Sequence, residues 1–258
     1  MTTRSGACLC GAVAFEAAGP LREVIACHCT RCRRTSGHYW AATSVPLGRF
    51  RLLRDDGLAW FRSSASARRG FCRRCGASLF WAPEGGDRMS FAAGALDGPT
   101  GLRVGAHWHV SDGGDYYAPQ GPPPPPDHDP PAELRATCLC GACRFTLPGP
   151  AGEITACHCR QCRKLSGHHS ASFDADAAAV AWQAREGLAE YATAGGGRRG
   201  FCAGCGSSLW FRAADGAFSV EAGAIEGRTG GRLAAHIFVA DKGDWYEIDD
   251  GLPQAAAW

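Results

Sequence analysis

The chain has 258 residues, a length that suits two domains of ordinary size. Its net charge is +2 with no long basic stretch, so we expect no nucleic-acid partner. The N-terminus lacks an apolar signal core, and no apolar run approaches the roughly 20 residues of a membrane span, which predicts a cytoplasmic protein with no membrane partner. Cysteines remain reduced in that compartment and are metal ligands more often than disulfides.

Seven cysteines organise the first half into three short motifs. They read C-x-C, then C-H-C-x-x-C, then C-x-x-C, which are spacings typical of zinc ligands. A disulfide scaffold conflicts with the expected compartment, and an iron–sulfur cluster is the remaining alternative. The seven cysteines are Cys8, Cys10, Cys27, Cys29, Cys32, Cys72 and Cys75.

Seven cysteines cannot make two closed four-cysteine sites. The C-x-C and C-x-x-C pairs can close one tetrahedral, structural site around a zinc ion. Cys27, Cys29 and Cys32 lie within six residues and can hold a second ion together, with its fourth position open. An open position is typical of a catalytic or ligand-binding zinc, and a thiolate-rich ion suits binding a substrate thiol. We therefore expect up to two Zn²⁺ ions per domain.

Basic and histidine side chains surround the triplet. Alternation along the chain points His28 away from the metal, whereas His38 follows in an S-G-H motif and is a candidate for contacting the ligands from behind. His107 is interpreted as a sheet histidine, and Ser36 with His38 as a candidate proton relay. The arginines near the triplet either bind substrate carboxylates or form a solvated basic loop; they are Arg31, Arg33 and Arg34.

Short alternating stretches predict strands rather than long helices. Residues 13–15, 79–81, 143–147, 209–211, 218–220 and 236–239 have this pattern, and one turn of helix is expected after each C-H-C-x-x-C. The fold class is therefore all-β, with two small sandwiches in tandem. Residues 119–133 contain a proline run typical of a semi-rigid linker, which places the domains at 1–118 and 134–258.

The second half repeats every cysteine spacing of the first. Each cysteine recurs 130 positions later (138 − 8 and 205 − 75), so the chain is a duplicated module. Cys143 has no counterpart; it aligns with Val13 and is interpreted as a buried apolar side chain. His158, Ser166, His168 and His236 repeat the first half's histidines and serine, and Arg160, Arg163 and Lys164 repeat its basic residues. The repeated cysteines are Cys138, Cys140, Cys157, Cys159, Cys162, Cys202 and Cys205.

These motifs resemble those of the glutathione-dependent formaldehyde-activating enzyme family, also called the GFA or CENP-V domain family. The matching segments are CLCGAV, CHCTRCRRTSGH and RRGFCRRCGASLF, then CLCGAC, CHCRQCRKLSGH and RRGFCAGCGSSLW. The resemblance implies zinc-containing β-sandwiches, with a structural zinc on each four-cysteine set and a catalytic zinc on each triplet. The activity that names the family joins formaldehyde to glutathione, which is carbon–sulfur lyase chemistry.

The resulting prediction is a zinc-dependent carbon–sulfur lyase-type enzyme acting on a small-molecule thiol adduct, with glutathione as the thiol that the resemblance suggests. The alternatives are a non-catalytic, zinc-stabilised interaction module and a metal-free thiol–disulfide redox protein. The two halves are expected to pack as an intramolecular pseudo-dimer. The second half is expected to be more active, because it carries Lys242 and Trp245 where the first has Gly113 and Tyr116.

Overall fold

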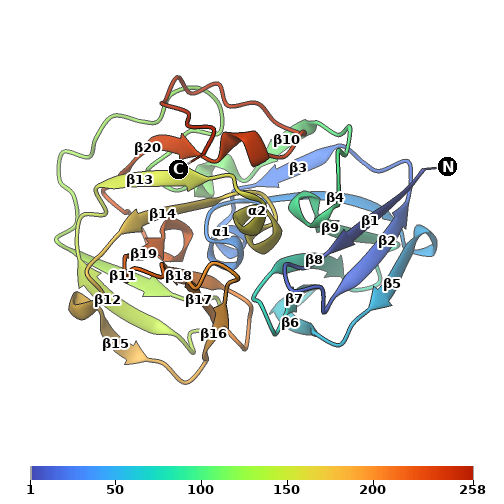
Figure 1. Cartoon of the computed structure of the whole chain (residues 1–258), viewed down its shortest axis with the longest axis horizontal. Coiled ribbons are helices and arrows are strands. Elements are labelled where there is room, and N and C mark those ends of the chain that lie inside the picture. The colour runs from blue at the N-terminus through green and yellow to red at the C-terminus, as the bar shows by residue number, and fades with distance from the viewer. Residues whose placement is uncertain (1, 258) are drawn as a thin grey trace.

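Each half of the chain folds into one small and one large β-sheet, as a computed structural model describing residues 2–257 shows (Figure 1). In the first half, the small sheet has the order β1-β2-β5 and the large sheet the order β10-β3-β4-β9-β8-β7-β6. The strands are β1 (Thr3–Ala7), β2 (Ala14–Ala18), β3 (Val24–Cys27), β4 (Trp40–Pro46), β5 (Phe50–Arg54), β6 (Leu58–Ser64), β7 (Ala67–Cys72), β8 (Ser78–Pro83), β9 (Arg88–Ala92) and β10 (Val104–Trp108).

The second half repeats this topology. Its small sheet has the order β11-β12-β15, and its large sheet runs β20-β13-β14-β19-β18-β17-β16. In both halves the pairing at one end of the large sheet is parallel, β10 with β3 and β20 with β13. The strands are β11 (Glu133–Thr137), β12 (Arg144–Pro148), β13 (Glu153–Cys157), β14 (Ser170–Asp174), β15 (Ala181–Ala184), β16 (Leu188–Ala192), β17 (Arg198–Cys202), β18 (Ser208–Arg212), β19 (Phe218–Glu221) and β20 (Arg232–Ile237).

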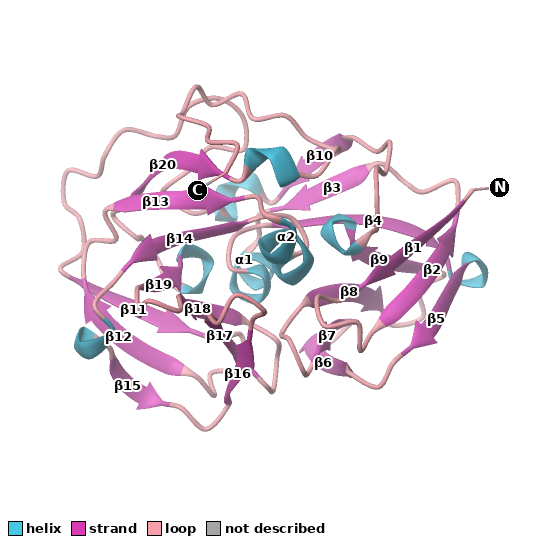
Figure 2. Ribbon diagram, in the orientation of Figure 1, coloured by secondary structure: helices cyan, strands magenta, loops and turns pink. Residues whose placement is uncertain are grey.

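Helices are few and short, and two of them lie between the halves (Figure 2). The α-helices α1 and α2 follow the C-H-C motifs, and each ends at a glycine with positive φ, Gly37 and Gly167. None of the helices in residues 2–257 has the length and apolar character that crossing a bilayer requires. The helices are α1 (Thr30–Ser36), α2 (Arg160–Ser166), and the 3₁₀ helices η1 (Leu47–Arg49), η2 (Ala93–Ala95), η3 (Val110–Asp112), η4 (Ala177–Ala179), η5 (Ala222–Ala224) and η6 (Val239–Asp241).

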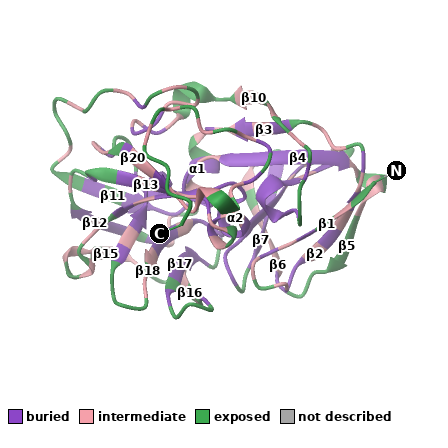
Figure 3. Ribbon diagram, turned by 45° about the horizontal axis from the view of Figure 1, so that its top comes forward, coloured by how far each residue is buried: buried purple, intermediate pink, exposed green. Residues whose placement is uncertain are grey.

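Aromatic side chains join the two sheets of the first half. Phe15 on the small sheet is fully buried and packs on Phe80 and Phe91 of the large sheet, with ring centroids 5.4 and 5.1 Å apart. The central strand β4 is buried over nearly its whole length (Figure 3). Burial of these rings stabilises the contact between the sheets, because each removes a large apolar area from water. The all-β prediction is confirmed.

One predicted strand ends earlier than its pattern indicated. The alternating stretch 236–239 was expected to be extended throughout, but β20 ends at Ile237. Phe238 has a φ of 55°, in the left-handed region, and Val239 begins η6. The chain turns here because it must leave the sheet edge, and alternation of apolar residues does not record such a turn.

The two halves contact each other through glycines beside the short helices. The Gly94 N–H donates to the Gly167 carbonyl at 2.9 Å, and the Gly223 N–H donates to the Gly37 carbonyl at 2.8 Å. A Cβ at Gly94 would lie 2.3 Å from the Arg163 carbonyl oxygen, so these two glycines allow a backbone approach that other residues would block.

The final segment of each half lies against the other half. Asp115 accepts hydrogen bonds from the Thr229 and Gly230 backbones, and Asp244 accepts them from Thr100 and the following glycine. Consequently Tyr116 is fully buried in the core of the second half. In the reciprocal contact, Trp245 of the second half is buried against Val24, Ala41 and Ala93 of the first half.

Candidate metal centres and an adjoining pocket

The four cysteines of the C-x-C and C-x-x-C pairs meet in each half. All their sulfur atoms lie within 4.8 Å of one another. The Sγ of Cys10 lies 3.6 Å from that of Cys8 and 3.7 Å from that of Cys72. In the second half, Cys140 Sγ lies 3.6 Å from both of its neighbours, Cys138 and Cys202. The sets are Cys8, Cys10, Cys72 and Cys75, and Cys138, Cys140, Cys202 and Cys205.

These separations fit a tetrahedral metal. Four sulfurs at about 2.3 Å from a zinc ion are about 3.8 Å from one another at the corners of a tetrahedron. The backbone N–H of Val13 donates to Cys8 Sγ at 3.3 Å, and that of Cys143 donates to Cys138 Sγ at 3.2 Å. Such donors stabilise thiolates, the form in which cysteine binds metals.

Each triplet sits where the third strand of its half passes into a helix. Cys27 ends β3, Cys29 caps the N-terminus of α1, and Cys32 lies in its first turn. Cys157, Cys159 and Cys162 take the same positions at β13 and α2. The three sulfurs of each triplet lie within 4.8 Å of one another, so these clusters can also hold a metal ion.

Comparison with known families agrees with this geometry. The family model described as "Glutathione-dependent formaldehyde-activating enzyme" (GFA) matches residues 3–112 and again residues 133–241.

The chain belongs to the GFA family. It carries two copies of the GFA domain, as the duplicated cysteine motifs predicted. A solved structure of a Rhodobacter sphaeroides protein, determined as a structural genomics target, is 24% identical to it. The match covers 40% of this chain and 98% of that one, with a TM-score of 0.35.

An arginine that the sequence reasoning did not single out contacts each GFA triplet. Arg69 Nη2 donates to Cys32 Sγ at 3.2 Å, and Arg199 Nη2 donates to Cys162 Sγ at 3.0 Å. Both arginines are nearly buried and lie on the strand leading to the C-x-x-C pair. The repeated RRGFC segment was the available signal, but the contact with the triplet depends on the sheet.

One cysteine of each triplet favours the thiolate form, whereas hydrogen bonding within the cluster and burial raise the pKa of the other two, Cys27 and Cys32 in the first half and Cys157 and Cys162 in the second. Hydrogen bonds from the Cys27 and Cys32 thiols, aided by the charge of Arg69, lower the pKa of Cys29. Hydrogen bonds from Cys157 and Cys162 likewise lower the pKa of Cys159 to about 2. A deprotonated sulfur at a helix N-cap can bind a metal without first losing a proton.

The histidines between the triplet cysteines are held away from the sulfurs. His28 Nδ1 lies 2.6 Å from the Tyr117 hydroxyl, and its Nε2 lies 3.0 Å from His107 Nδ1. His158 makes the matching bonds to Tyr246 and His236. Both ring nitrogens are therefore occupied by hydrogen bonds. Burial, reinforced by the neighbouring histidine, lowers the pKa of His28 to about 4.

The residues expected to relay protons have other partners. Ser36 Oγ donates to the Cys32 carbonyl of its own helix, and Ser166 repeats this with Cys162. His38 Nδ1 lies 2.7 Å from the Tyr116 hydroxyl, and His168 Nε2 lies 2.7 Å from that of Tyr39. These four side chains therefore contribute to the helices and to the contact between the halves.

Three of the six basic residues of the short helices reach across to the other half. Arg34 pairs with Glu226 at 2.9 Å, and Lys164 pairs with Asp97 at 2.7 Å. Arg163 donates to the carbonyls of Gly94 and Leu96. Within the first half, Arg33 Nε donates to the Asp112 carbonyl at 3.0 Å. Arg31 lines a pocket beside its own triplet, and Arg160 is exposed.

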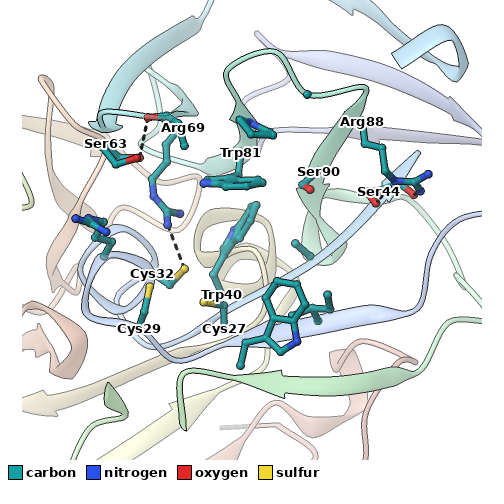
Figure 4. Close-up of a pocket in the computed structure, with 18 of the residues that line it drawn as sticks. Cys27, Cys29, Cys32, Trp40, Ser44, Ser63, Arg69, Trp81, Arg88 and Ser90 are labelled. Carbon is teal, nitrogen blue, oxygen red and sulfur yellow. Dashed lines mark hydrogen bonds between the residues drawn. The ribbon is translucent and has the colours of Figure 1, made fainter. Parts of the chain in front are cut away.

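A pocket of about 550 Å³ opens beside the first triplet. Figure 4 shows the sulfurs of Cys27, Cys29 and Cys32 at one side of it, with the rings of Trp40 and Trp81 between them and the opposite wall. Trp108 lines the same pocket and is 53% exposed. The pocket therefore combines three thiol groups with a wall that includes three tryptophan rings.

The second triplet has different surroundings. Glu221 is buried, accepts a hydrogen bond from Ser170 at 2.7 Å, and lies 3.4 Å from Arg199 Nη1. The strand register places Ala92 of the first half at the position of Glu221, since Ala42 pairs with Ala92 as Ser172 pairs with Glu221. A carboxylate thus neutralises the arginine at the second triplet, whereas an alanine stands there in the first half.

Proposed function

We propose that this chain is a zinc-dependent enzyme of the carbon–sulfur lyase class that acts on a thiol adduct. The observation that carries the proposal is the pocket of about 550 Å³ opening onto Cys27, Cys29 and Cys32. Within the family, glutathione and formaldehyde are the substrates that the family description suggests. A pocket of this size accommodates a small-molecule thiol together with a carbonyl compound.

In the proposed reaction, the sulfur of the substrate thiol adds to a carbonyl carbon. A carbon–sulfur bond forms, and the thiol proton ends on the carbonyl oxygen; the reverse direction breaks the same bond. Zinc bound by the triplet would supply a Lewis acid that holds the substrate sulfur as a thiolate. Arg69 stabilises the negative charge of the cysteine cluster through its bond to Cys32. Trp40 and Trp81 exclude water from the reacting groups.

The pocket favours the first half as the substrate-binding half, in place of the expectation that the second half is more active. That expectation rested on the cation at Lys242. Lys242 Nζ donates to the Tyr246 carbonyl at 2.7 Å and pairs with Glu247 at 3.3 Å, so its charge is already engaged. We further propose a mainly structural zinc domain for the second half, supported by the Arg199–Glu221 pair beside its triplet.

The remaining assignments follow from the same arrangement. We propose two zinc ions per domain, one on each four-cysteine set and one on each triplet, supported by the sulfur clusters. We propose domains at 1–118 and 134–258, with the linker at 119–133, packed as an intramolecular pseudo-dimer; the reciprocal Gly94–Gly167 and Gly223–Gly37 bonds support this packing. The fifteen unpaired cysteines support a reducing, cytoplasmic location.

Thiol-dependent aldehyde consumption by the zinc-loaded full chain tests the proposal. Wild-type protein is compared with Cys29→Ser and Cys159→Ser, using glutathione and other thiols with formaldehyde and larger aldehydes. Cys143→Val is the matched control, because it removes a cysteine outside the triplets and restores the residue type of Val13. We expect Cys29→Ser to abolish turnover and Cys143→Val to retain it. Full turnover by folded, zinc-loaded Cys29→Ser would refute a role of the first triplet in catalysis.

A further inference from the structure

Two arginines that line the first-half pocket, Arg22 and Arg88, bind the same serine, Ser44. Figure 4 shows Arg88 and Ser44 on the wall opposite the cysteines. Arg22 Nε and Arg88 Nε each donate to Ser44 Oγ at 3.1 Å. Their Nη2 atoms donate to the carbonyls of Ala42 and Ser44, also at 3.1 Å. Both guanidinium groups are thereby fixed side by side at the pocket wall, each using N–H groups on neutral oxygens.

The positive charge of this pair is not balanced by a neighbouring carboxylate. Neither Arg22 nor Arg88 takes part in any ion pair found within residues 2–257. Asp87 is the acidic residue among those that line the pocket, and it is exposed. Burial and the charge of Arg88 both lower the pKa of Arg22, so the two cations destabilise each other in the free protein. An anion bound between them would relieve that repulsion.

The second half lacks this pair at the corresponding positions. The cysteine alignment places Gly152 at the position of Arg22, and the strand register places Ala217 at that of Arg88. Ser44 is replaced by Asp174, since Ser44 pairs with Ser90 as Asp174 pairs with Ser219. Two cations and a neutral hydroxyl in one half thus correspond to an acid and no cation in the other. The fold of the module alone therefore does not require the arginines.

We propose that Arg22 and Arg88 form a carboxylate subsite, which makes the first half selective for thiols or thiol adducts with a carboxylate at the end remote from the sulfur. The sulfur would lie at the triplet, and the apolar middle of the molecule would lie along Trp40 and Trp81. Paired guanidinium groups suit this role because their N–H groups match the geometry of a carboxylate. The placement of the sulfur rests on the proposed function; the carboxylate subsite rests on the arginines.

Calorimetric titration of the zinc-loaded full chain under reducing conditions tests the subsite. The probes are 3-mercaptopropionate, 6-mercaptohexanoate and 8-mercaptooctanoate, each against the mercapto-alcohol of equal length, and octanoate against octanol. The variants are Arg22→Gln, Arg88→Gln and Arg88→Lys. Arg51→Gln is the matched control, because Arg51 is an exposed arginine of the same half that pairs with Glu16 and does not line the pocket.

We expect wild type and Arg51→Gln to bind at least one carboxylate probe about tenfold more tightly than its alcohol. Arg22→Gln or Arg88→Gln should reduce that ratio to near one, with Arg88→Lys between. Equal affinity for carboxylates and alcohols at every chain length would overturn the proposal, as would a preference that survives both glutamine variants. If octanoate shows the arginine-dependent preference while the thiol group adds no affinity, the subsite stands and the proposed function fails.

Discussion

Three buried histidines between the two halves should make the fold sensitive to acid. His169 is 4% exposed, and its ring centroid lies 4.2 Å from that of His168 and 4.8 Å from that of His38. Burial, followed by the charges of the neighbouring histidines, lowers the pKa of all three. They are therefore neutral in the folded protein where unfolded histidine, with a pKa near 6.5, takes up a proton.

The direction and size of the effect follow from this difference. Below about pH 6.5 the unfolded chain binds more protons than the folded one, so the free energy of unfolding falls as the pH falls and is fully present above that value. At pH 5.5 each such histidine costs about 1.4 kcal/mol relative to pH 7.5. The three together cost about 4 kcal/mol, a large part of the stability of an ordinary domain. His28 and His158, with pKa values lowered to about 4 and about 3, act in the same direction.

Urea denaturation from pH 7.5 to 5.5 measures this dependence. In His169→Gln, the loss in free energy of unfolding between pH 7.5 and pH 5.5 should be about 1.4 kcal/mol smaller than in wild type, because one histidine fewer takes up a proton on unfolding. His128→Gln, at an exposed position in the linker, is the control and should leave it unchanged. Acid also releases zinc, so zinc retention is measured at each pH, and only the difference between variants with equal zinc content is interpreted. An identical pH dependence in His169→Gln and wild type would refute the reasoning.

Three further outcomes are expected. Cys72→Ser should unfold or aggregate the first half, because zinc binding and folding are coupled, whereas Cys29→Ser should keep the fold. Circular dichroism and zinc analysis distinguish the two variants. The reverse pattern would mean that the structural and catalytic roles of the two cysteine sets are exchanged. Gly223→Ala should lower the free energy of unfolding by about 1–3 kcal/mol in a urea titration, because its Cβ would lie 2.5 Å from the Arg33 carbonyl oxygen. Gly195→Ala is the control and should lower it far less, since there is open space around Gly195. Proteolysis within residues 119–131 should leave the halves together in size-exclusion chromatography, since the Asp115 and Asp244 contacts do not pass through the linker; separate elution of the fragments would contradict this.

The all-β class and the duplication could be predicted from the sequence because both produce patterns between residues close together in the chain. Alternation follows the two-residue period of a strand, and cysteine spacing is fixed when several ligands must reach one ion. The two RRGFC segments were visible, yet the contact of Arg69 with Cys32 was not predicted. It depends on the place of β7 in the sheet, which brings Arg69 beside a cysteine of α1 that lies 37 residues earlier in the chain. Contacts of that kind are set by strand order, which local spacing does not encode.

The exchanged terminal segments were missed for a related reason. The sequence shows GDYY ending the first half and GDWY near the end of the second, and each would ordinarily be assigned to its own domain. In the fold, Asp115 caps a turn of the second half and Asp244 caps the equivalent turn of the first. A segment and its repeat carry the same local signal, so the sequence cannot tell which copy each of them binds.

Duplication within one chain explains how the two halves differ without losing their common fold. The residues that join the halves are repeated: Gly94 and Gly223 make equivalent bonds, and Asp115 and Asp244 make equivalent caps. A change at one of these positions disturbs both halves at once, since each half completes the core of the other. Pocket residues carry no such reciprocal constraint. Substitution there leaves these joining contacts in place, so the first-half pocket can gain paired arginines while the second triplet gains a buried carboxylate.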